Sequence, residues 1–263
     1  MSDFAFAVII TPRDGKDWIA QVRRAEDQGF SAILLPDTMF TPSPFPALAA
    51  AAAVTSTIKL RPWVLSAPLR HRAATAREVS ALQLLSDGRF ELGIGAGRPG
   101  SDGEAAKLGM TWGTPGERRA KVAETVAAVR ESVDPVPPVI VAASGPRLLA
   151  DAAGYADRVS LAAPPAATEA DLLPMADAVR SVRELPITYQ LVGVGDRLPY
   201  FTATKFGHTA AGLREAGAVG VLSADPDTAI AELYNLRDRL GIDELVVPGE
   251  LADDFAQVLA RLG

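Results

Sequence analysis

The sequence predicts a single α/β domain folded as a (β/α)8 barrel, in which eight parallel strands alternate with eight principal helices. Short apolar runs without polar alternation recur along the chain, and such runs are typical of parallel strands covered on both faces. A helix-like segment follows each run. Eight such units fit within 263 residues, which is a usual length for a closed barrel. An open, doubly wound sheet is the alternative.

The eight expected strands are apolar runs bounded by turns. They lie at residues 4–10, 32–35, 58–65, 89–94, 139–143, 158–162, 187–194 and 244–247. Gly29 closes the first helix before the second strand, and Ser86-Asp87-Gly88 forms the turn before the fourth strand. Hydrophobic residues make up 48% of the chain, which is enough to cover these strands with a sizeable core.

Capping residues mark several of the expected helix starts. The helices lie at about 17–28, from 44, 71–85, 115–131, from 145, 169–182, 226–240 and 252–262. Ser43-Pro44 and Asp225-Pro226 each place a capping side chain before a proline that suits the first helical turn. Thr114 and Glu117 have the spacing of a capping box.

One segment falls outside the repeating pattern. Residues 196–224, with a short helix near 209–215, form an insertion before the seventh main helix of a single domain that spans 1–263. Few structural signals occur in the insertion, so we expect it to be a mobile lid over the barrel mouth. Tight packing of the segment would count against a lid.

Charge and composition exclude several classes of function. The net charge is −6 and no basic block longer than a pair occurs, which argues against nucleic acid as a partner. The chain has no cysteine, and this excludes disulfides, thiol nucleophiles and thiolate metal sites. The start of the sequence has neither a basic leader region nor an apolar run long enough to span a membrane. We expect a cytoplasmic protein with a small-molecule substrate.

The residues that follow the strands are the candidates for a functional site, because barrel active sites lie at the carboxyl ends of the strands. Gly95, Gly97 and Gly100 have the spacing G-x-G-x-x-G after the fourth strand. A dinucleotide fingerprint is a weak interpretation, since no helix opens at once and no acidic strand end follows. The glycines either let a planar ring approach the backbone closely or serve a tight loop of positive φ.

A second candidate lies where the fifth strand meets a helix. Ser144-Gly145-Pro146 opens this helix, and free backbone N–H groups together with the helix dipole would form an anion site there. Arg147 adds a cation beside it. The competing interpretation is that Ser144 caps the helix and binds nothing.

Strand alternation places charged and aromatic side chains on one face of the third strand. Lys59, Arg61, Trp63 and Leu65 share that face, and Glu91 shares a face with the glycines of the next strand. Since an unpaired buried charge is costly, we expect Arg61 and Glu91 to form a structural ion pair below the site. Trp63 is expected either to wall the pocket or to serve as a simple core aromatic.

Other barrel chemistries lack their side chains. A metal-dependent hydrolase needs clustered histidines and carboxylates, but only His71 and His208 occur, far apart in the sequence. A Schiff-base enzyme needs a lysine at the carboxyl end of a strand, and the lysines here fall at a strand start, in loops or in helices. No metal is expected. This poverty of acid–base and nucleophilic groups suits an enzyme whose cofactor carries the reaction.

Four segments resemble a known family. The similarity lies in the runs LLPDTMFTPSPFPALAAAAAVT, VLSAPLRHRAATAREVSALQLLSDGRFELGIGAGRP, VIVAASGPRLLADAAGYADRVSL and DPDTAIAELYNLRDRLGIDELVVPGELADDFAQVLARL. They resemble the bacterial luciferase-like monooxygenase superfamily, whose members are flavin- or F420-dependent oxidoreductases. The resemblance covers nearly the whole chain, and LSDGRFELGIGAGRP is its most specific part.

The resemblance implies a barrel that holds FMN or coenzyme F420, with the ring system across the mouth near strands two to four. It implies a phosphate site at Ser144-Gly145-Pro146. It also implies a non-proline cis peptide at the end of the third strand, near Trp63-Val64, and a homodimer.

The sequence departs from the family pattern at three positions. Many relatives carry a proton-donating histidine where Thr38 follows Asp37 here. F420-dependent sugar-phosphate dehydrogenases carry a glutamate near Arg98, and since an arginine cannot act as that acid, sugar-phosphate oxidation is not implied. The luciferase pattern has a phosphate-binding arginine where Ala96 stands, which favours F420 over FMN.

The combined prediction is an oxidoreductase that uses coenzyme F420, or alternatively FMN, to reduce or monooxygenate a small organic substrate. The predicted catalytic residues are Asp37, Thr38 and Arg98. The predicted cofactor-binding residues are Trp63, Val64, Leu65, Gly95, Ala96, Gly97, Ser144, Gly145, Pro146 and Arg147. The predicted substrate contacts are Arg70 and His71. The alternatives are a non-catalytic flavin-binding protein and a barrel that has lost its cofactor, with Trp63 in the ring space.

Overall fold

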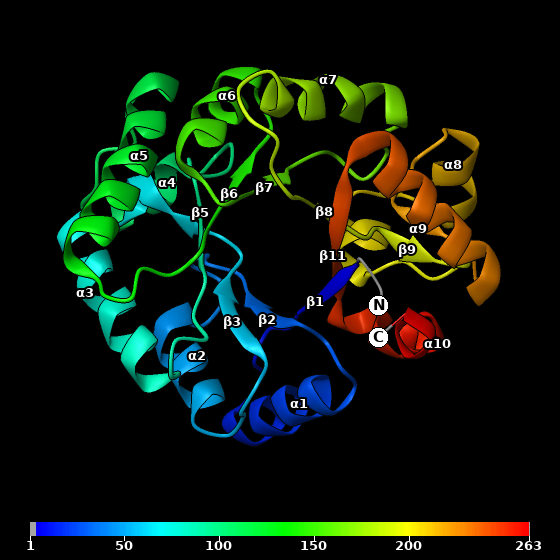
Figure 1. Cartoon of the computed structure of the whole chain (residues 1–263), viewed down its shortest axis with the longest axis horizontal. Helices are drawn as coiled ribbons and strands as arrows, with labels where there is room; N and C mark the ends of the chain where they lie inside the picture. The colour runs from blue at the N-terminus through cyan, green and yellow to red at the C-terminus, as the bar shows by residue number, and fades with distance from the viewer. Residues whose placement is uncertain (1–3, 263) are drawn as a thin grey trace.

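The computed structural model describes residues 4–262 and contains the predicted barrel. Its main sheet has nine strands, and all neighbouring pairs run parallel. In spatial order the strands are β3 (Lys59–Pro62), β2 (Ala32–Leu35), β1 (Ala5–Ile9), β11 (Ile242–Pro248), β8 (Ile187–Gln190), β7 (Arg158–Leu161), β6 (Val139–Ala143), β5 (Leu92–Gly95) and β4 (Leu65–Ser66). In Figure 1 the strands form the inner ring of the molecule and the helices form the outer ring.

Two consecutive pieces of chain, β3 and β4, form the two ends of this sheet. β4 pairs with β5, and Leu60 of β3 forms a parallel bridge with Phe90, which lies just before β5. These contacts close the ring, so β3 and β4 together act as the third of eight barrel strands. An open doubly wound sheet would leave two unpaired edges, and the structure excludes it.

Helices follow the strands as the sequence predicts. They are α1 (Gly15–Asp27), α2 (Pro44–Ala52), α3 (Arg72–Leu85), α4 (Asp102–Lys107), α5 (Pro115–Ser132), α6 (Pro146–Tyr155), α7 (Glu169–Arg180), α8 (Ala210–Glu215), α9 (Pro226–Leu240) and α10 (Ala252–Leu262). Asp225 caps α9 by accepting a hydrogen bond from the N–H of Thr228 at 2.9 Å. Thr114 and Glu117 form the predicted capping box of α5. The sequence did not predict α4, because six residues in a glycine-rich loop give no periodic pattern.

The strand predicted at 187–194 divides in two. The N–H of Leu191 still bonds to the carbonyl of Val246 in β11, whereas the N–H of Val192 bonds to Gly220 in the insertion. The chain therefore changes partner between these residues. Its continuation, β9 (Gly193–Val194), pairs with β10 (Val221–Leu222) in a separate two-stranded sheet.

The residues predicted as an insertion, 196–224, lie between β9 and α9. Part of this segment packs with Val192 in a small separate core, whose other members are Ala210, Leu213, Ala218 and Val221. This packing counts against a lid that moves as a whole. The π-helical turn at Phe201–Lys205 differs, because each of its residues is at least partly exposed.

Within residues 4–262, the helices are all too short or too polar to cross a membrane. Residues 1–3, which begin the segment where no leader is expected, lie outside the described residues.

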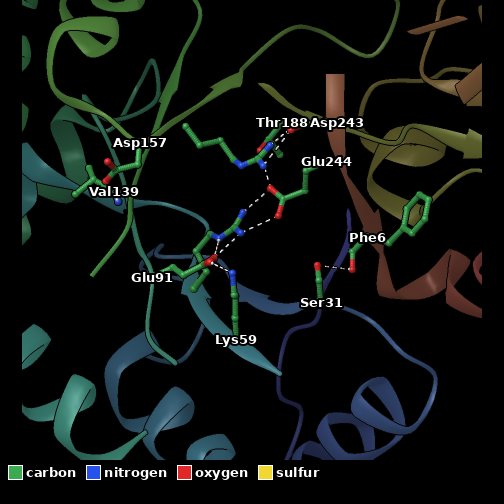
Figure 2. Close-up of polar contacts among 11 residues, drawn as sticks. Phe6, Ser31, Lys59, Glu91, Val139, Asp157, Thr188, Asp243 and Glu244 are labelled. Atoms are coloured by element: carbon green, nitrogen blue, oxygen red, sulfur yellow. Dashed lines mark hydrogen bonds and ion pairs between the residues drawn. The ribbon is translucent and has the colours of Figure 1, made fainter. Parts of the chain in front are cut away.

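The barrel interior near the strand starts is charged. Arg61 is 2% exposed, and its Nε donates to Glu91 at 2.7 Å while its terminal nitrogens donate to Glu244 at 2.7 and 2.8 Å. Thr188 donates to Glu244 at 2.6 Å, and Lys59 lies 3.0 Å from Glu91 (Figure 2). The predicted pair of Arg61 and Glu91 is confirmed. Glu244, 183 residues from Arg61 in sequence, completes the network.

Charge pairing outweighs burial in this network. Burial alone would raise the pKa of Glu244, yet Arg61 lowers the pKa of Glu244 to about 2. Burial likewise works against the charged form of Arg61, but Glu244 and Glu91 raise the pKa of Arg61. Arg61 and Glu244 therefore stay ionised at neutral pH and fill the lower interior with fixed charges.

Candidate active site

The carboxyl ends of the strands gather four of the predicted turns at one end of the barrel, because the strands run parallel. Asp37-Thr38 follows β2, Trp63-Val64 separates β3 from β4, residues 95–97 end β5, and residues 144–147 join β6 to α6. We call the end of the barrel that carries these four turns, with the other strand ends beside them, the rim. The peptide bond between Trp63 and Val64 is cis, as the resemblance implies.

The indole of Trp63 lies across the barrel interior at the level of the rim. Its Nε1 donates to Oε1 of Gln190 at 3.3 Å. Gln190 ends β8, the seventh barrel strand, and in a ring of eight the third and seventh strands face each other. The indole packs in a cluster that includes Ala7 and Ala32, whose small side chains leave room for it. Because Trp63 is half-buried, it forms an aromatic floor to the rim.

The side chains after Trp63 do not follow the predicted alternation. Leu65 is fully buried in the main hydrophobic core, so the side chain predicted to contact a cofactor does not reach the rim. The physical reason is the interruption between β3 and β4, which breaks the regular pleat. Val64 and Ser66 face the glycines of β5 and the residues after it instead.

The glycines that end the fourth barrel strand make room for the protein's own groups. A Cβ on Gly95 would lie 3.0 Å from the side chain of Val64. A Cβ on Gly97 would collide with the ring of Trp112 and would lie 2.9 Å from Oγ of Ser66. Gly97 also has a φ of +79°, as the tight-loop interpretation predicts. On the side where a Cβ would lie, neighbouring side chains fill the space beside these two glycines. The close approach of a ring to this backbone stays a prediction.

Arg70 and Asp37, predicted as a substrate contact and a catalytic residue, pair with each other. Nε and a terminal nitrogen of Arg70 donate to the two carboxylate oxygens of Asp37 at 2.8 and 2.7 Å. Asp37 also accepts from the N–H of Ser66 at 3.3 Å. Burial works against the charge of Arg70, yet the carboxylate of Asp37 raises the pKa of Arg70. The pair clamps the loop after β2 to the segment after β4, and it occupies the guanidinium group.

The other predicted catalytic residues also have local partners. Oγ1 of Thr38 accepts the N–H of Phe40 at 3.1 Å and lies 3.1 Å from the hydroxyl of Thr41. Arg98 forms an ion pair with Glu104 of α4. His71, the second predicted substrate contact, is exposed at the start of α3. Thr38 and Arg98 thus stabilise their own loops in this structure.

The start of α6 is accessible to an anion. Gly145 is the N-cap residue, and within the described residues no side-chain cap bonds to the first turn of α6. Ser144 and Arg147 are exposed. Ser144 therefore does not cap the helix, and the backbone N–H groups of the first turn point to the rim side of the barrel.

Three residues at the rim were not among the predicted catalytic or binding residues: Ser66, Trp112 and Gln190. Gln190 could have been predicted from the sequence. It lies two residues after Thr188 in one strand, and alternation places both side chains inside the barrel. Ser66 gave no clear signal, because it is a small polar residue at the end of a strand, where serine is common before a turn. Trp112 lies in a loop, and its contact with the guanidinium of Arg118, 4.6 Å from the ring centroid, depends on tertiary packing.

Exposure indicates where the rim is open. Ser144, Ala162 and Gln190, at the ends of β6, β7 and β8, are all exposed.

Two cavities lie away from the rim, one of about 540 Å³ between α3 and α5 and one of about 210 Å³ beside the Arg61 network. Across residues 4–262, no group of three or more His, Cys, Asp or Glu side chains is placed to hold a metal ion.

A closed parallel barrel with an aromatic floor, an open helix start and few free acid–base groups defines a class of barrel enzymes in which a bound organic cofactor does the chemistry. Comparison with known proteins gives the family. The profile of luciferase-like monooxygenases matches residues 9–233, so the chain belongs to the luciferase-like monooxygenase family.

One curated relative is a 5,10-methylenetetrahydromethanopterin reductase from Methanopyrus kandleri. It is 32% identical over 111 residues, which are 42% of this chain and 31% of that protein. The chain thus matches about a third of that relative's length.

Solved structures share the whole architecture. The coenzyme F420 dependent tetrahydromethanopterin reductase from Methanopyrus kandleri is 17% identical, with a TM-score of 0.72 over 98% of this chain and 97% of that chain. An F420-dependent secondary alcohol dehydrogenase in complex with an F420-acetone adduct is 15% identical, with a TM-score of 0.75 over 100% of both chains. The oxygenating constituent of 3,6-diketocamphane monooxygenase from Pseudomonas putida, in complex with FMN, is 14% identical, with a TM-score of 0.75 over 97% and 95%. At these identities the likeness shows the fold.

Proposed function

We propose that the protein is an oxidoreductase that binds a flavin-type cofactor at the rim and acts on a small organic substrate. The observation that carries the proposal is the floor formed by Trp63, a half-buried aromatic surface that crosses the barrel between opposite strands. Aromatic surfaces suit contact with a planar ring system. Membership of the luciferase-like family and the F420- or FMN-binding neighbours support the same function.

The residues at the rim fit such a group. Trp63 offers an aromatic face, and Ser66 offers a buried hydroxyl that has no partner among the described residues. The first turn of α6 and the exposed Arg147 would hold a phosphate. When bound, the cofactor would supply hydride transfer or, with dioxygen, oxygenation. The chain's own residues would bind and orient it and exclude water.

We favour F420 over FMN as the cofactor. Ala96 stands where the family pattern has a phosphate-binding arginine, and Arg98 does not replace that arginine, because it pairs with Glu104. The relatives from Methanopyrus kandleri and the secondary alcohol dehydrogenase, which are named for reduction or F420 dependence, support this choice.

Titration of the purified protein with F420 and with FMN, in separate experiments, tests the proposal. We expect the fluorescence of F420 to be quenched to a 1:1 endpoint, with weaker or no quenching of FMN. Quenching of FMN alone would reverse the choice of cofactor. Failure of both compounds to bind would contradict the proposed function.

A non-catalytic flavin-binding protein is the second candidate. It is favoured by the contacts of the predicted catalytic residues, because Asp37 pairs with Arg70 and Thr38 bonds within its own loop. Cofactor binding without turnover, when reductants and candidate acceptors are supplied, would support this candidate over the enzyme.

We further propose a homodimer in the cytoplasm. Leu84 and Leu85 on α3 are 78% and 61% exposed, and α3 borders the groove between α3 and α5. A second copy would remove this apolar surface from water. Light scattering at several protein concentrations measures the oligomeric state, and a monomer at all of them would contradict the dimer.

A further inference from the structure

Ser66 carries a group that the structure leaves without a use. The residue is 7% exposed, and its Oγ is a buried atom with no hydrogen-bond partner among residues 4–262. A buried hydroxyl without a partner is unfavourable, and each such case calls for an explanation. We propose that Ser66 is a further cofactor-binding residue, whose hydroxyl hydrogen-bonds to a polar edge of the ring system. This inference rests on the proposed function.

The surroundings of the hydroxyl place it at the rim. Oγ lies 2.9 Å from the position that a Cβ on Gly97 would occupy. Any residue other than glycine at position 97 would therefore crowd the hydroxyl. Ser66 also follows the Trp63 floor by three residues, so the floor and the hydroxyl lie on one short segment of the third barrel strand.

Other rim residues hold Ser66 in place. Its N–H donates to Oδ2 of Asp37 at 3.3 Å, and Arg70 fixes both oxygens of Asp37 at 2.8 and 2.7 Å. The ion pair thus joins the loop after β2 to the backbone of Ser66. Asp37 and Arg70 are therefore positioning residues. Both carboxylate oxygens of Asp37 are already occupied by Arg70 and by the N–H of Ser66.

The chemistry of the hydroxyl matches a planar heterocycle. A serine hydroxyl donates one hydrogen bond and accepts others, so it suits both the ring N–H and the ring carbonyl groups of a flavin or deazaflavin. The group is neutral, and it adds a directional contact without adding charge. Removal of the hydroxyl from the protein alone breaks no hydrogen bond, because the described structure shows none for this atom.

The chain offers a matched control for this test. Oγ1 of Thr75, on α3, is also buried and has no partner within the described residues. Ser66→Ala and Thr75→Val each remove one such hydroxyl, the first at the rim and the second on an outer helix. We expect both variants to keep the wild-type melting temperature.

The test is the dissociation constant of F420 and of FMN for the wild type and both variants, with the absorption spectrum of the bound cofactor. We expect Ser66→Ala to weaken binding about 5- to 10-fold, the typical effect of one hydrogen bond, and to shift the spectrum. Thr75→Val should bind within about twofold of the wild type. Unchanged binding and spectrum in Ser66→Ala, or equal weakening in both variants, would overturn the role of Ser66. If the wild type binds neither cofactor, the proposed function itself fails and the inference falls with it.

The positioning role of Arg70 is tested by a separate set of binding measurements. Arg70→Met should weaken binding, and adding Ser66→Ala to it should cost less than Ser66→Ala costs alone, because both changes act on the same contact. Arg70→Lys should restore part of the affinity. Full additivity of the two changes would overturn the positioning role while leaving the contact by Ser66 intact.

Discussion

Gly97 shows how a single residue shapes the rim. Its φ of +79° disfavours any residue with a side chain. The ring of Trp112 and the hydroxyl of Ser66 fill the space where a Cβ would lie. Gly100 has nearly the same φ, +81°, but apart from its own chain neighbours no described residue comes within 4 Å of the position of its Cβ. Comparing substitutions at the two glycines therefore distinguishes the free-energy cost of an unfavourable φ from the cost of steric crowding.

We predict that Gly100→Ala lowers the free energy of unfolding by about 1–2 kcal/mol, for the unfavourable φ alone. Gly97→Ala should lose that amount and about 1–3 kcal/mol more, because its Cβ collides with Trp112. Urea denaturation of both variants measures the difference. Equal losses would show that the close packing of Gly97 does not contribute.

At the scale of elements, Glu26 joins α1 to the start of β3. Its Oε1 accepts hydrogen bonds from the N–H groups of Ser56, Thr57 and Ile58 at 2.9, 2.6 and 3.0 Å. Partial burial works against the charged form, yet these backbone hydrogen bonds lower the pKa of Glu26 from 4.5 to about 2. The carboxylate thus fixes the turn that leads into the third barrel strand.

We predict that Glu26→Gln destabilises the protein by about 1 kcal/mol at pH 7. The folded pKa lies below the unfolded pKa, so the stabilisation is complete above pH 4.5 and is lost as the pH falls toward 2. The difference between variant and wild type should shrink over that range in thermal melts. Glu124→Gln, which breaks an exposed pair with Arg72, is the control and should change little. A pH-independent difference would contradict the role of the carboxylate.

The local sequence pattern predicted a strand or helix well where an apolar run is bounded by turn or capping residues. The strand at 139–143 was predicted with its observed bounds, because an apolar run there is bounded by Pro138 and Ser144. Alternation failed at Leu65, because the break between β3 and β4 reverses which side chains point inward. The division of β8 from β9 was missed as well, since the change of partner at Val192 depends on the distant Gly220.

For the whole molecule, the charged network around Arg61 joins β3 to the residue before β5 and to β8 and β11 on the other side of the ring. The sequence predicted the contact with Glu91, because the third and fourth strands are neighbours in a parallel barrel. It did not predict Glu244, which reaches the same place only when the barrel closes. The gathering of the rim turns was predicted for the same topological reason, but the contacts of Asp37, Arg70 and Ser66 depend on side-chain packing that no local pattern reports.

We predict that Arg61→Met lowers the free energy of unfolding by about 3–5 kcal/mol, because it removes the buried cation that both carboxylates share and leaves only Lys59 beside Glu91 and Thr188 beside Glu244. Arg72→Met removes an exposed pair instead and should cost at most about 1 kcal/mol. Urea denaturation of the two variants checks the contrast. A loss below about 1 kcal/mol for Arg61→Met would show that the network does not hold the barrel together.

The most direct measurement for the central claim is a crystal structure of the protein with the cofactor that it binds in solution. We predict that the ring system lies at the rim, over the indole of Trp63 and within hydrogen-bonding distance of Ser66, with the phosphate at the start of α6. A ring bound in the groove between α3 and α5 or in the cavity beside the Arg61 network would contradict the claim. So would a Trp63 side chain that fills the ring space and leaves the cofactor outside the barrel mouth.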